Sequence, residues 1–340
     1  PFTYKVPEEF NNEIKIGQIV KVPFGKGNKT SEGFILNLKN DDNIKFKTKN
    51  IAAILVKDPV IDEDDINLIE FLREKTLCKY IDAFRLLIPV GIMKGAKAKK
   101  KKVIVLKNED LSNIKNPDGY KKIVEFFKTN SGKYTKSELI NEHSISQYKL
   151  NKLIENEVLS IEEESVFRYN DRVYNKDSAK TLTIEQENII REYINSDDTM
   201  FLLKGVTGSG KTEVYMKLVE RVLLEGKSAI ILVPEIALTP QMIERFKGRF
   251  GVNVALFHSK LSDGERFDEW FRVKEGKAKV IVGARSAIFL PAKNLGLIII
   301  DEEHENTYKS EQNPKYQTKE VAEYLSELKR CKVILGSATP

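Results

Sequence analysis

Cysteine is scarce in this chain: Cys78 and Cys331 are the two among 340 residues, and they lie far apart. Two distant cysteines exclude both a disulfide framework and the cluster of thiols that a structural zinc site needs. No apolar run approaches the ~20 residues of a membrane span, and we expect no secretory signal. We therefore expect a protein of the reducing cytoplasm that has no membrane partner.

A strong charge of one sign is also missing. The chain has 56 basic and 50 acidic residues, a net charge of +6, which permits a nucleic-acid partner without requiring one. Its length predicts two or three domains with sizeable cores. Because it starts at Pro1 and stops at Pro340 within a motif, we interpret it as part of a longer protein cut at both ends.

Residues 205–212 fit the phosphate-loop pattern G-x-x-x-x-G-K-[ST]. An apolar run at 200–203 precedes them and predicts a buried strand, and apolar residues at helical spacing follow. Glycines let backbone N–H groups approach phosphate oxygens at a helix N-terminus. Lys211 is expected to reach the β- and γ-phosphates and Thr212 to hold Mg²⁺. A chance glycine-rich turn is the alternative, which this context disfavours. The nucleotide-binding residues predicted here are Gly205, Thr207, Gly208, Ser209, Gly210, Lys211 and Thr212.

A second motif follows the apolar run 297–300 as Asp301, Glu302, Glu303 and His304. Beside a phosphate loop, an acidic pair after a buried strand predicts that Asp301 anchors Mg²⁺ through a water. Glu302 would orient and deprotonate the water that attacks the γ-phosphate. The alternative is an acidic surface turn. The two motifs together predict ATP and Mg²⁺ as cofactors.

Residues 175–340 alternate strands and helices, which predicts an α/β domain with a parallel sheet and crossover helices. We expect the strands at 200–203, 229–233, 253–257, 279–283, 297–301 and 332–336. Near-continuous apolar runs such as 297–300 are typical of a sheet that is covered on both faces.

The remaining chain predicts three further segments. Residues 1–60 combine short β-type runs with glycines and predict a small β-rich domain. Residues 61–117 predict helices up to Pro89 and then a lysine-rich linker, in which the lysines between 94 and 102 are either solvated or phosphate contacts. Residues 118–174 predict three helices and a hairpin, with a capping box at Thr135 and Glu138. This arrangement resembles a winged helix, which could bind DNA or act as a spacer.

Several motifs occur in one order: GVTGSGKTEVY at 205–215, VPEIALTPQ at 233–241, GARSA at 283–287, DEEH at 301–304 and GSATP at 336–340. Together they resemble superfamily 2 DExH helicases, and in particular the PriA family of replication restart helicases. The resemblance implies a RecA-like motor lobe, truncated at its third motif, behind a domain that holds a DNA 3′ end. It implies an ATP-dependent 3′→5′ helicase of the bacterial cytoplasm that acts at stalled forks. Its partners would be forked and single-stranded DNA, single-stranded DNA-binding protein, and primosome or helicase-loading proteins.

The resemblance also implies roles for single residues. Gln186 would read adenine, and His304, Ser337 and Thr339 would couple the nucleotide state to DNA. Residues in motifs along the DNA track would be Thr239 and Arg285, although Arg285 could instead form a structural salt bridge. The pocket for the 3′ end would include Phe2, Tyr4, Gly25 and Lys49. The loop after the acidic motif would sense single-stranded DNA through Tyr308, Lys309 and Tyr316, unless it is an ordinary exposed loop.

The chain departs from the family at two positions. Thr3 replaces an acidic residue of the 3′-end pocket, and the family's Arg-Tyr-His-Ala-Arg-Asp stretch is KYQTKE at 315–320, which loses bidentate arginine geometry.

A second motor lobe, its arginine finger and the cysteines that bind zinc in the family are absent from the sequence. Two alternatives to the helicase therefore stay open. One is a platform that binds ATP and fork DNA without turnover, and the other is a different DExH translocase of repair or restriction.

Overall fold

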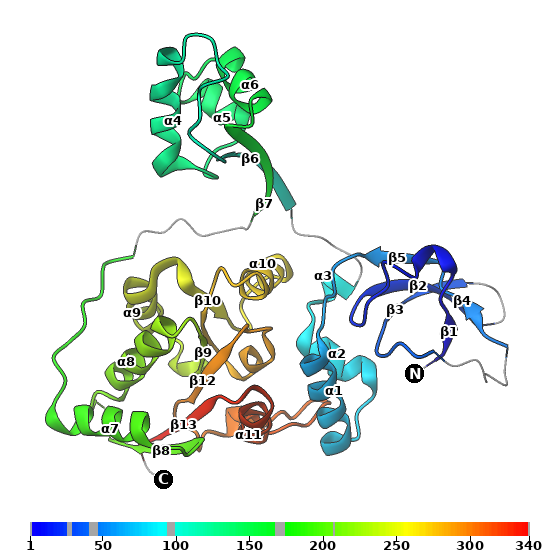
Figure 1. The fold of residues 1–340 in the computed structure, drawn as a ribbon. Helices are drawn as coiled ribbons and strands as arrows, with labels where there is room; N and C mark the ends of the chain where they lie inside the picture. The colour runs from blue at the N-terminus through cyan, green and yellow to red at the C-terminus, as the bar shows by residue number, and fades with distance from the viewer. Residues whose placement is uncertain are drawn as a thin grey trace. The chain divides into compact units, whose positions relative to one another are not determined.

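The structure, a computed structural model, describes residues 2–25, 29–40, 47–93, 99–166, 174–206 and 208–338. It divides into two compact units, residues 1–96 with 170–340 and residues 97–169 (Figure 1). Each unit is described by itself. None of the helices in the described ranges is long and apolar enough to cross a membrane.

The first unit is built on a parallel sheet, which confirms the predicted fold class. Its strand order in the described part of the chain is β10-β11-β9-β12-β13-β8, and every neighbouring pair is parallel. The strands are β8 (Met200–Lys204), β9 (Ser228–Leu232), β10 (Val254–Phe257), β11 (Val280–Gly283), β12 (Leu295–Ile300) and β13 (Lys332–Ser337). All six lie at the predicted positions within two residues at each end.

Both faces of this sheet are covered. On one face lie α7 (Ile184–Asn195), α8 (Lys211–Leu224) and α9 (Pro240–Phe250), and on the other lie α10 (Asp263–Lys274) and α11 (Thr318–Lys329) (Figure 1). Side chains of β12 alternate between the two cores: Leu297 and Ile299 belong to one, Ile298 and Ile300 to the other. All four are at most 1% exposed, which explains why this strand has no polar position.

The N-terminal part of the first unit contains two small sheets. In one, β2 (Ile19–Phe24) pairs antiparallel with β3 (Lys29–Phe34) and β5 (Ala53–Val56). In the other, β1 (Tyr4–Lys5) pairs with β4 (Lys49–Asn50). Gly17 begins the turn into β2 with φ +84°, and a Cβ there would lie 1.8 Å from the carbonyl oxygen of Ile61, so the position requires glycine.

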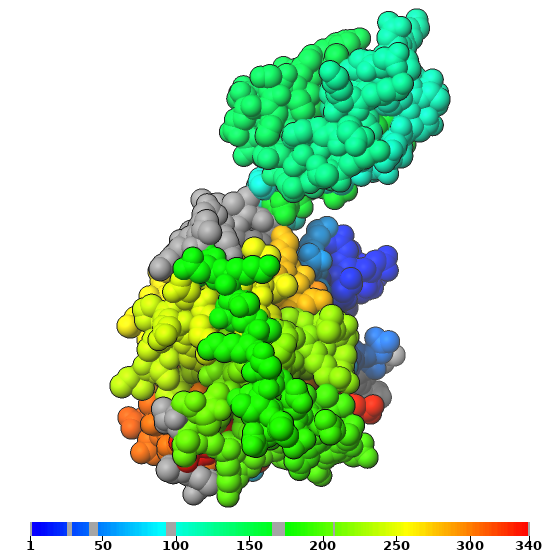
Figure 2. Space-filling view, turned by 90° about the vertical axis from the view of Figure 1, so that its left-hand side faces the viewer, coloured from blue at the N-terminus to red at the C-terminus, as the bar shows by residue number. Residues whose placement is uncertain are grey.

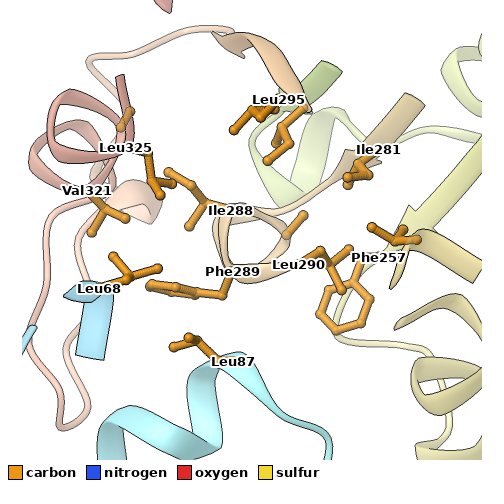
Figure 3. Packing of buried hydrophobic residues seen from close by; sticks show 14 of the residues in the cluster. Leu68, Leu87, Phe257, Ile281, Ile288, Phe289, Leu290, Leu295, Val321 and Leu325 are labelled. Atoms are coloured by element: carbon orange, nitrogen blue, oxygen red, sulfur yellow. The ribbon is translucent and has the colours of Figure 1, made fainter. Parts of the chain in front are cut away.

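Three helices then complete the cover of the larger sheet: α1 (Glu63–Thr76), α2 (Tyr80–Leu87) and α3 (Val90–Met93). Phe289, from the short 3₁₀ helix η4 (Arg285–Phe289), lies between Leu68 of α1 and Leu87 of α2 (Figure 3). The indole Nε1 of Trp270 in α10 donates to the carbonyl oxygen of Leu87 at 2.7 Å. These helices therefore belong to the core of the domain built on the parallel sheet, whereas the sequence placed them in a linker.

The second unit contains β6 (Lys99–Leu106), α4 (Asp118–Asn130), α5 (Lys136–Asn141), α6 (Gln147–Glu155) and β7 (Leu159–Val166). Strands β6 and β7 pair antiparallel beside a core that includes Phe127 and Leu150. The capping box predicted at Thr135 and Glu138 is confirmed, with both reciprocal hydrogen bonds present. The two hairpin strands expected at 166–169 and 173–174 lie largely outside the described residues.

The described lysines of the basic run are the first residues of strand β6, and they lie opposite the glutamates of strand β7. Lys100 pairs with Glu163 at 3.2 Å and Lys101 with Glu164 at 3.9 Å. The sequence placed this run in a linker and the start of the winged-helix unit at residue 118. In the structure the compact unit that contains these helices begins at residue 97, because β6, which carries the lysines, pairs with β7 about sixty residues downstream. Lys94 and Lys97 lie outside the described residues.

We predict that Trp270→Phe destabilises the first unit by about 1–3 kcal/mol, because it leaves the buried Leu87 carbonyl without its donor. Urea unfolding followed by circular dichroism measures the change. Tyr324→Phe is the matched control: its hydroxyl also donates to a helix carbonyl, that of Asn67 in α1, but in an exposed position. We expect this control to cost less than ~0.5 kcal/mol. Equal effects of the two variants would contradict a special role of the indole bond.

Candidate nucleotide site and DNA-facing residues

A cavity of about 490 Å³ lies at the edge of the sheet where β8 and β12 end. Because the carboxyl ends of parallel strands meet at one edge, loops far apart in sequence converge there. The lining includes Lys180, Thr183, Gln186, Gly208, Ser209, Gly210, Lys211, Thr212, Asp301 and Glu302. The structure thus brings together the predicted phosphate-loop and acidic residues in a space of the size that ligand pockets have.

The phosphate loop packs tightly around its lysine. Lys211 Nζ donates to the carbonyl oxygen of Gly205 at 2.5 Å and lies 3.2 Å from Glu302 Oε1. A Cβ at Gly205 would stand 2.6 Å from the Ser209 hydroxyl, and Gly210, the N-cap of α8, has φ +86°. The loop therefore presents the N-terminus of α8 and a cation to the cavity, which is an anion-binding arrangement. Thr207 lies outside the described residues.

Gln186 is held at the loop by two hydrogen bonds. Its Oε1 accepts from the backbone N–H of Thr183 at 3.0 Å, which completes a capping box at the start of α7. Its Nε2 donates to the carbonyl oxygen of Ser209 at 3.1 Å. The side chain predicted to read adenine is therefore fixed between the helix start and the phosphate loop.

Asp301 leaves β12 with its carboxylate already engaged. Its Oδ1 accepts a hydrogen bond from the Tyr215 hydroxyl at 2.9 Å. Burial raises the pKa of the Asp301 carboxyl above its ordinary value, and the bond from Tyr215 opposes that rise. The next residue, Glu302, has φ +49°, a left-handed conformation that is uncommon outside glycine. Asp301 is thus buried and hydrogen-bonded, and the residue that follows it has an uncommon backbone conformation.

The predicted coupling residues lie beside Glu302. Its Oε2 accepts from the backbone N–H of Ala338 at 3.2 Å and lies 3.8 Å from His304 Nδ1. His304 Nδ1 is in turn 3.3 Å from the Ser337 hydroxyl. The structure therefore brings Glu302, His304 and Ser337 into one cluster, whereas Thr339 lies outside the described residues.

The residues expected to hold Mg²⁺ fit that ion. Thr212 and Asp301 line the same cavity and offer hard oxygen atoms, which Mg²⁺ prefers in combination with waters and substrate phosphates. Within the described ranges, no group of three or more His, Cys, Asp or Glu residues could hold a metal by itself. This fits an ion that takes most of its ligands from nucleotide and water.

The loop after the acidic motif differs from its prediction. Tyr308 and Tyr316 are 5% and 4% exposed. The Tyr308 hydroxyl donates to the carbonyl oxygen of Asp301 at 2.7 Å, and the Tyr316 ring packs edge-on against Phe289. In this conformation neither ring can stack on a base, so the expectation that they do is corrected: the rings support the acidic motif and the core.

Arg285 and Thr239 make structural contacts. The Arg285 guanidinium donates to the carbonyl oxygens of Thr307 and Lys309, and so fixes the loop that carries Tyr308. Thr239 is the N-cap of α9 and accepts from the backbone N–H of Met242 at 3.3 Å. The salt bridge considered for Arg285 from sequence is replaced by bonds to main-chain carbonyls.

The four residues of the predicted 3′-end pocket surround the turn at 23–25. Tyr4 donates its hydroxyl to the Pro23 carbonyl at 3.2 Å, and Lys49 Nζ donates to the Gly25 carbonyl at 2.8 Å. Phe2 packs edge-on against Phe24, with ring centroids 5.0 Å apart, and is 74% exposed. Phe24 is an exposed aromatic that sequence reasoning missed, although it sits within the VPFG run.

Comparisons with known proteins agree with this architecture. Residues 1–89 match the family model "3′DNA-binding domain (3′BD)" of PriA, and residues 183–340 match "DEAD/DEAH box helicase". Replication restart protein PriA of Bacillus subtilis is 36% identical over 100% of this chain and 51% of its own length. The chain belongs to the PriA family. The PriA of Chlamydia trachomatis is 33% identical over 99% of this chain and 47% of its own length.

The chain thus spans about half the length of these PriA relatives. Among solved structures, RecG bound to a three-way DNA junction is similar at 26% identity over 47% of this chain and 21% of that chain. The TM-score of this match is 0.37.

An ion network that the PriA-type motifs do not include supports one wall of the cavity. Arg249 of α9 donates to Glu213 and Glu220 of α8, each at 2.9 Å, and lies 2.7 Å from Asp177 Oδ2. This network ties the segment from 174 onward across α8 and α9, where the green band runs over the surface in Figure 2. Glu213 and Glu220 lie on one face of a helix, and Arg245 and Arg249 lie on one face of the next. This spacing could have predicted an acidic and a basic helix face.

We predict that Arg249→Met destabilises the first unit by about 3 kcal/mol, because it removes one of the two arginine partners of Glu213, a buried carboxylate, and leaves Asp177 and Glu220 without the same cation. Chemical unfolding measures this loss. Arg221→Met is the matched control, because its pair with Glu225 is half exposed, and it should cost less than ~1 kcal/mol. A loss of less than ~1 kcal/mol for Arg249→Met would show that the network does not hold this wall.

Proposed function

We propose that this chain supplies the ATP-binding and 3′-end-binding parts of an ATP-dependent 3′→5′ DNA helicase that restarts replication at stalled or branched forks. The observation that carries the proposal is the convergence of Lys211, Thr212, Asp301 and Glu302 on one cavity, in a chain whose first 89 residues match the 3′DNA-binding domain. Single-stranded DNA-binding protein and primosome or helicase-loading proteins would be its partners in the bacterial cytoplasm.

The residues of the phosphate loop and of the acidic motif have separate roles in ATP hydrolysis. Backbone N–H groups at the start of α8 and the Lys211 ammonium bind the phosphates. Thr212 and Asp301 would hold Mg²⁺, which would neutralise charge on the β- and γ-phosphates. Glu302 orients the attacking water and accepts its proton. Because Glu302 also contacts His304 and the backbone of Ala338, a change at the water site would alter contacts with the motif that begins at Gly336.

At the other end of the chain, the exposed Phe2 ring and its neighbour Phe24 offer a surface on which a terminal base can stack. Lys49 lies at the same turn and provides a cation for a phosphate. Thr3 has a neutral hydroxyl where the family has a carboxylate, so recognition of the 3′-hydroxyl would be weaker in this chain.

A platform that binds ATP and fork DNA without turnover is the second candidate. Hydrolysis in such motors is accelerated by an arginine finger that faces the γ-phosphate. Among the described cavity-lining residues the arginine is Arg245, and its guanidinium donates to Glu213 at 3.1 Å. Arg245 is thus already engaged by a carboxylate, which supports this second candidate. A DExH translocase of repair or restriction would instead lack a preference for a 3′ end at the junction.

Nucleotide turnover separates these candidates. We predict that Lys211→Ala abolishes binding of a fluorescent ATP analogue, because the phosphates lose their cation. Glu302→Gln should retain binding and lower ATP hydrolysis at least ~100-fold, because its amide cannot accept the proton. Phosphate release with and without a synthetic fork measures turnover. Absence of turnover in the wild type, with binding that depends on Lys211, would favour the platform, and full hydrolysis by Lys211→Ala would contradict the site.

A DNA-binding experiment tests the 3′-end pocket. We predict that Phe2→Ala weakens binding to a fork with a 3′ end at its junction by about 1–3 kcal/mol, the contribution of one stacked base. Fluorescence anisotropy with forks that have or lack this 3′ end measures the difference. Lys100→Gln with Lys101→Gln is the control: both lysines are paired within the winged-helix unit, so fork affinity should be unchanged. Equal weakening by Phe2→Ala on both forks would contradict a 3′-end pocket.

A further inference from the structure

Tyr215 is buried at the place where three motifs meet. It lies in α8, three residues after Thr212, and is 0% exposed. Residues three apart on a helix share a face, so Tyr215 lies below the first turn that carries Thr212. Its hydroxyl donates to Asp301 Oδ1 at 2.9 Å.

Gly336 of β13 completes this contact from the neighbouring strand. A Cβ at Gly336 would stand 1.9 Å from the Tyr215 hydroxyl oxygen and 3.0 Å from Asp301 Oδ1. No larger residue fits unless the hydroxyl or the carboxylate moves. The glycine of the GSATP motif therefore makes room for the bond between the phosphate-loop helix and the acidic motif.

We infer that Tyr215 is a positioning residue that orients the Asp301 carboxylate for the metal ion of the proposed nucleotide site, with Gly336 as the space that permits it. The tyrosine holds Oδ1 of this carboxylate, which also receives a hydrogen bond from the backbone N–H of Glu302. The Tyr308 hydroxyl donates to the main-chain carbonyl oxygen of Asp301 at 2.7 Å, so the backbone of Asp301 is fixed independently of its carboxylate. Tyr215 thus acts on the direction of the Asp301 side chain and not on its backbone.

This inference depends on the proposed nucleotide site, and the test separates the two. Binding of the fluorescent analogue mant-ADP is measured with EDTA and over a series of Mg²⁺ concentrations. Removal of a group that orients a metal ligand typically costs 10–100-fold in metal affinity. We expect Tyr215→Phe to raise the Mg²⁺ concentration needed for tight mant-ADP binding by about 10-fold. Affinity in EDTA should stay within about 2-fold, because the phosphate contacts of the loop are unchanged.

Tyr193→Phe is the matched control, since Tyr193 is buried in the same hydrophobic cluster but lies on α7, away from Asp301. It should leave the Mg²⁺ series unchanged. Gly336→Ala keeps the hydroxyl but displaces it, and should shift the Mg²⁺ series in the same direction as Tyr215→Phe. The double variant should cost less than the two single shifts together, because the closest clash of the new Cβ is with the removed hydroxyl.

An unchanged Mg²⁺ series for Tyr215→Phe, in a protein that binds mant-ADP normally, would overturn the inference and leave the nucleotide site standing. Equal losses with EDTA and with Mg²⁺ would also overturn it, because they would mean general damage to the site. Absence of mant-ADP binding by the wild type would overturn the proposed function itself.

Discussion

The parallel register of four adjacent strands is the constraint on which this structure depends. Ile300 of β12 lies opposite Leu232 of β9 on one side and Leu335 of β13 on the other, and Gly336 lies opposite Leu203 of β8. Because these strands end at the same level, the loops that follow β8, β12 and β13 meet at one edge of the sheet. The phosphate loop, the acidic motif and the GSATP motif are therefore brought together by backbone pairing, before any side chain is considered.

The second constraint is the covering of both faces. One face has α7, α8 and α9, and the other needs α1 to α3 from the N-terminal region as well as α10 and α11. Trp270 bonds to the Leu87 carbonyl, and Lys329 pairs with Asp64 at 2.5 Å, so the 3′-end domain shares a core with the sheet.

Local patterns predicted the features that depend on local physics. The strands, the phosphate loop and the cap at Thr135 follow from apolar runs and from spacings of a few residues. Features that depend on distant partners were not predictable in this way. The lysines of β6 looked solvated because Glu163 and Glu164 lie far along the chain, and Tyr308 looked like a DNA contact because its acceptor, the Asp301 carbonyl, is visible only in the fold. The contact of Tyr215 with Asp301 was not predictable for the same reason, because in the sequence Tyr215 is one of several apolar residues at helical spacing.

The most direct test of the account is a crystal structure of this chain with ADP and Mg²⁺. The account predicts phosphates at the N-terminus of α8, Mg²⁺ on the Thr212 hydroxyl with Asp301 bound through a water, and the bond between Tyr215 and Asp301 preserved. Nucleotide bound elsewhere, or an Asp301 carboxylate turned away from the metal towards another partner, would contradict it.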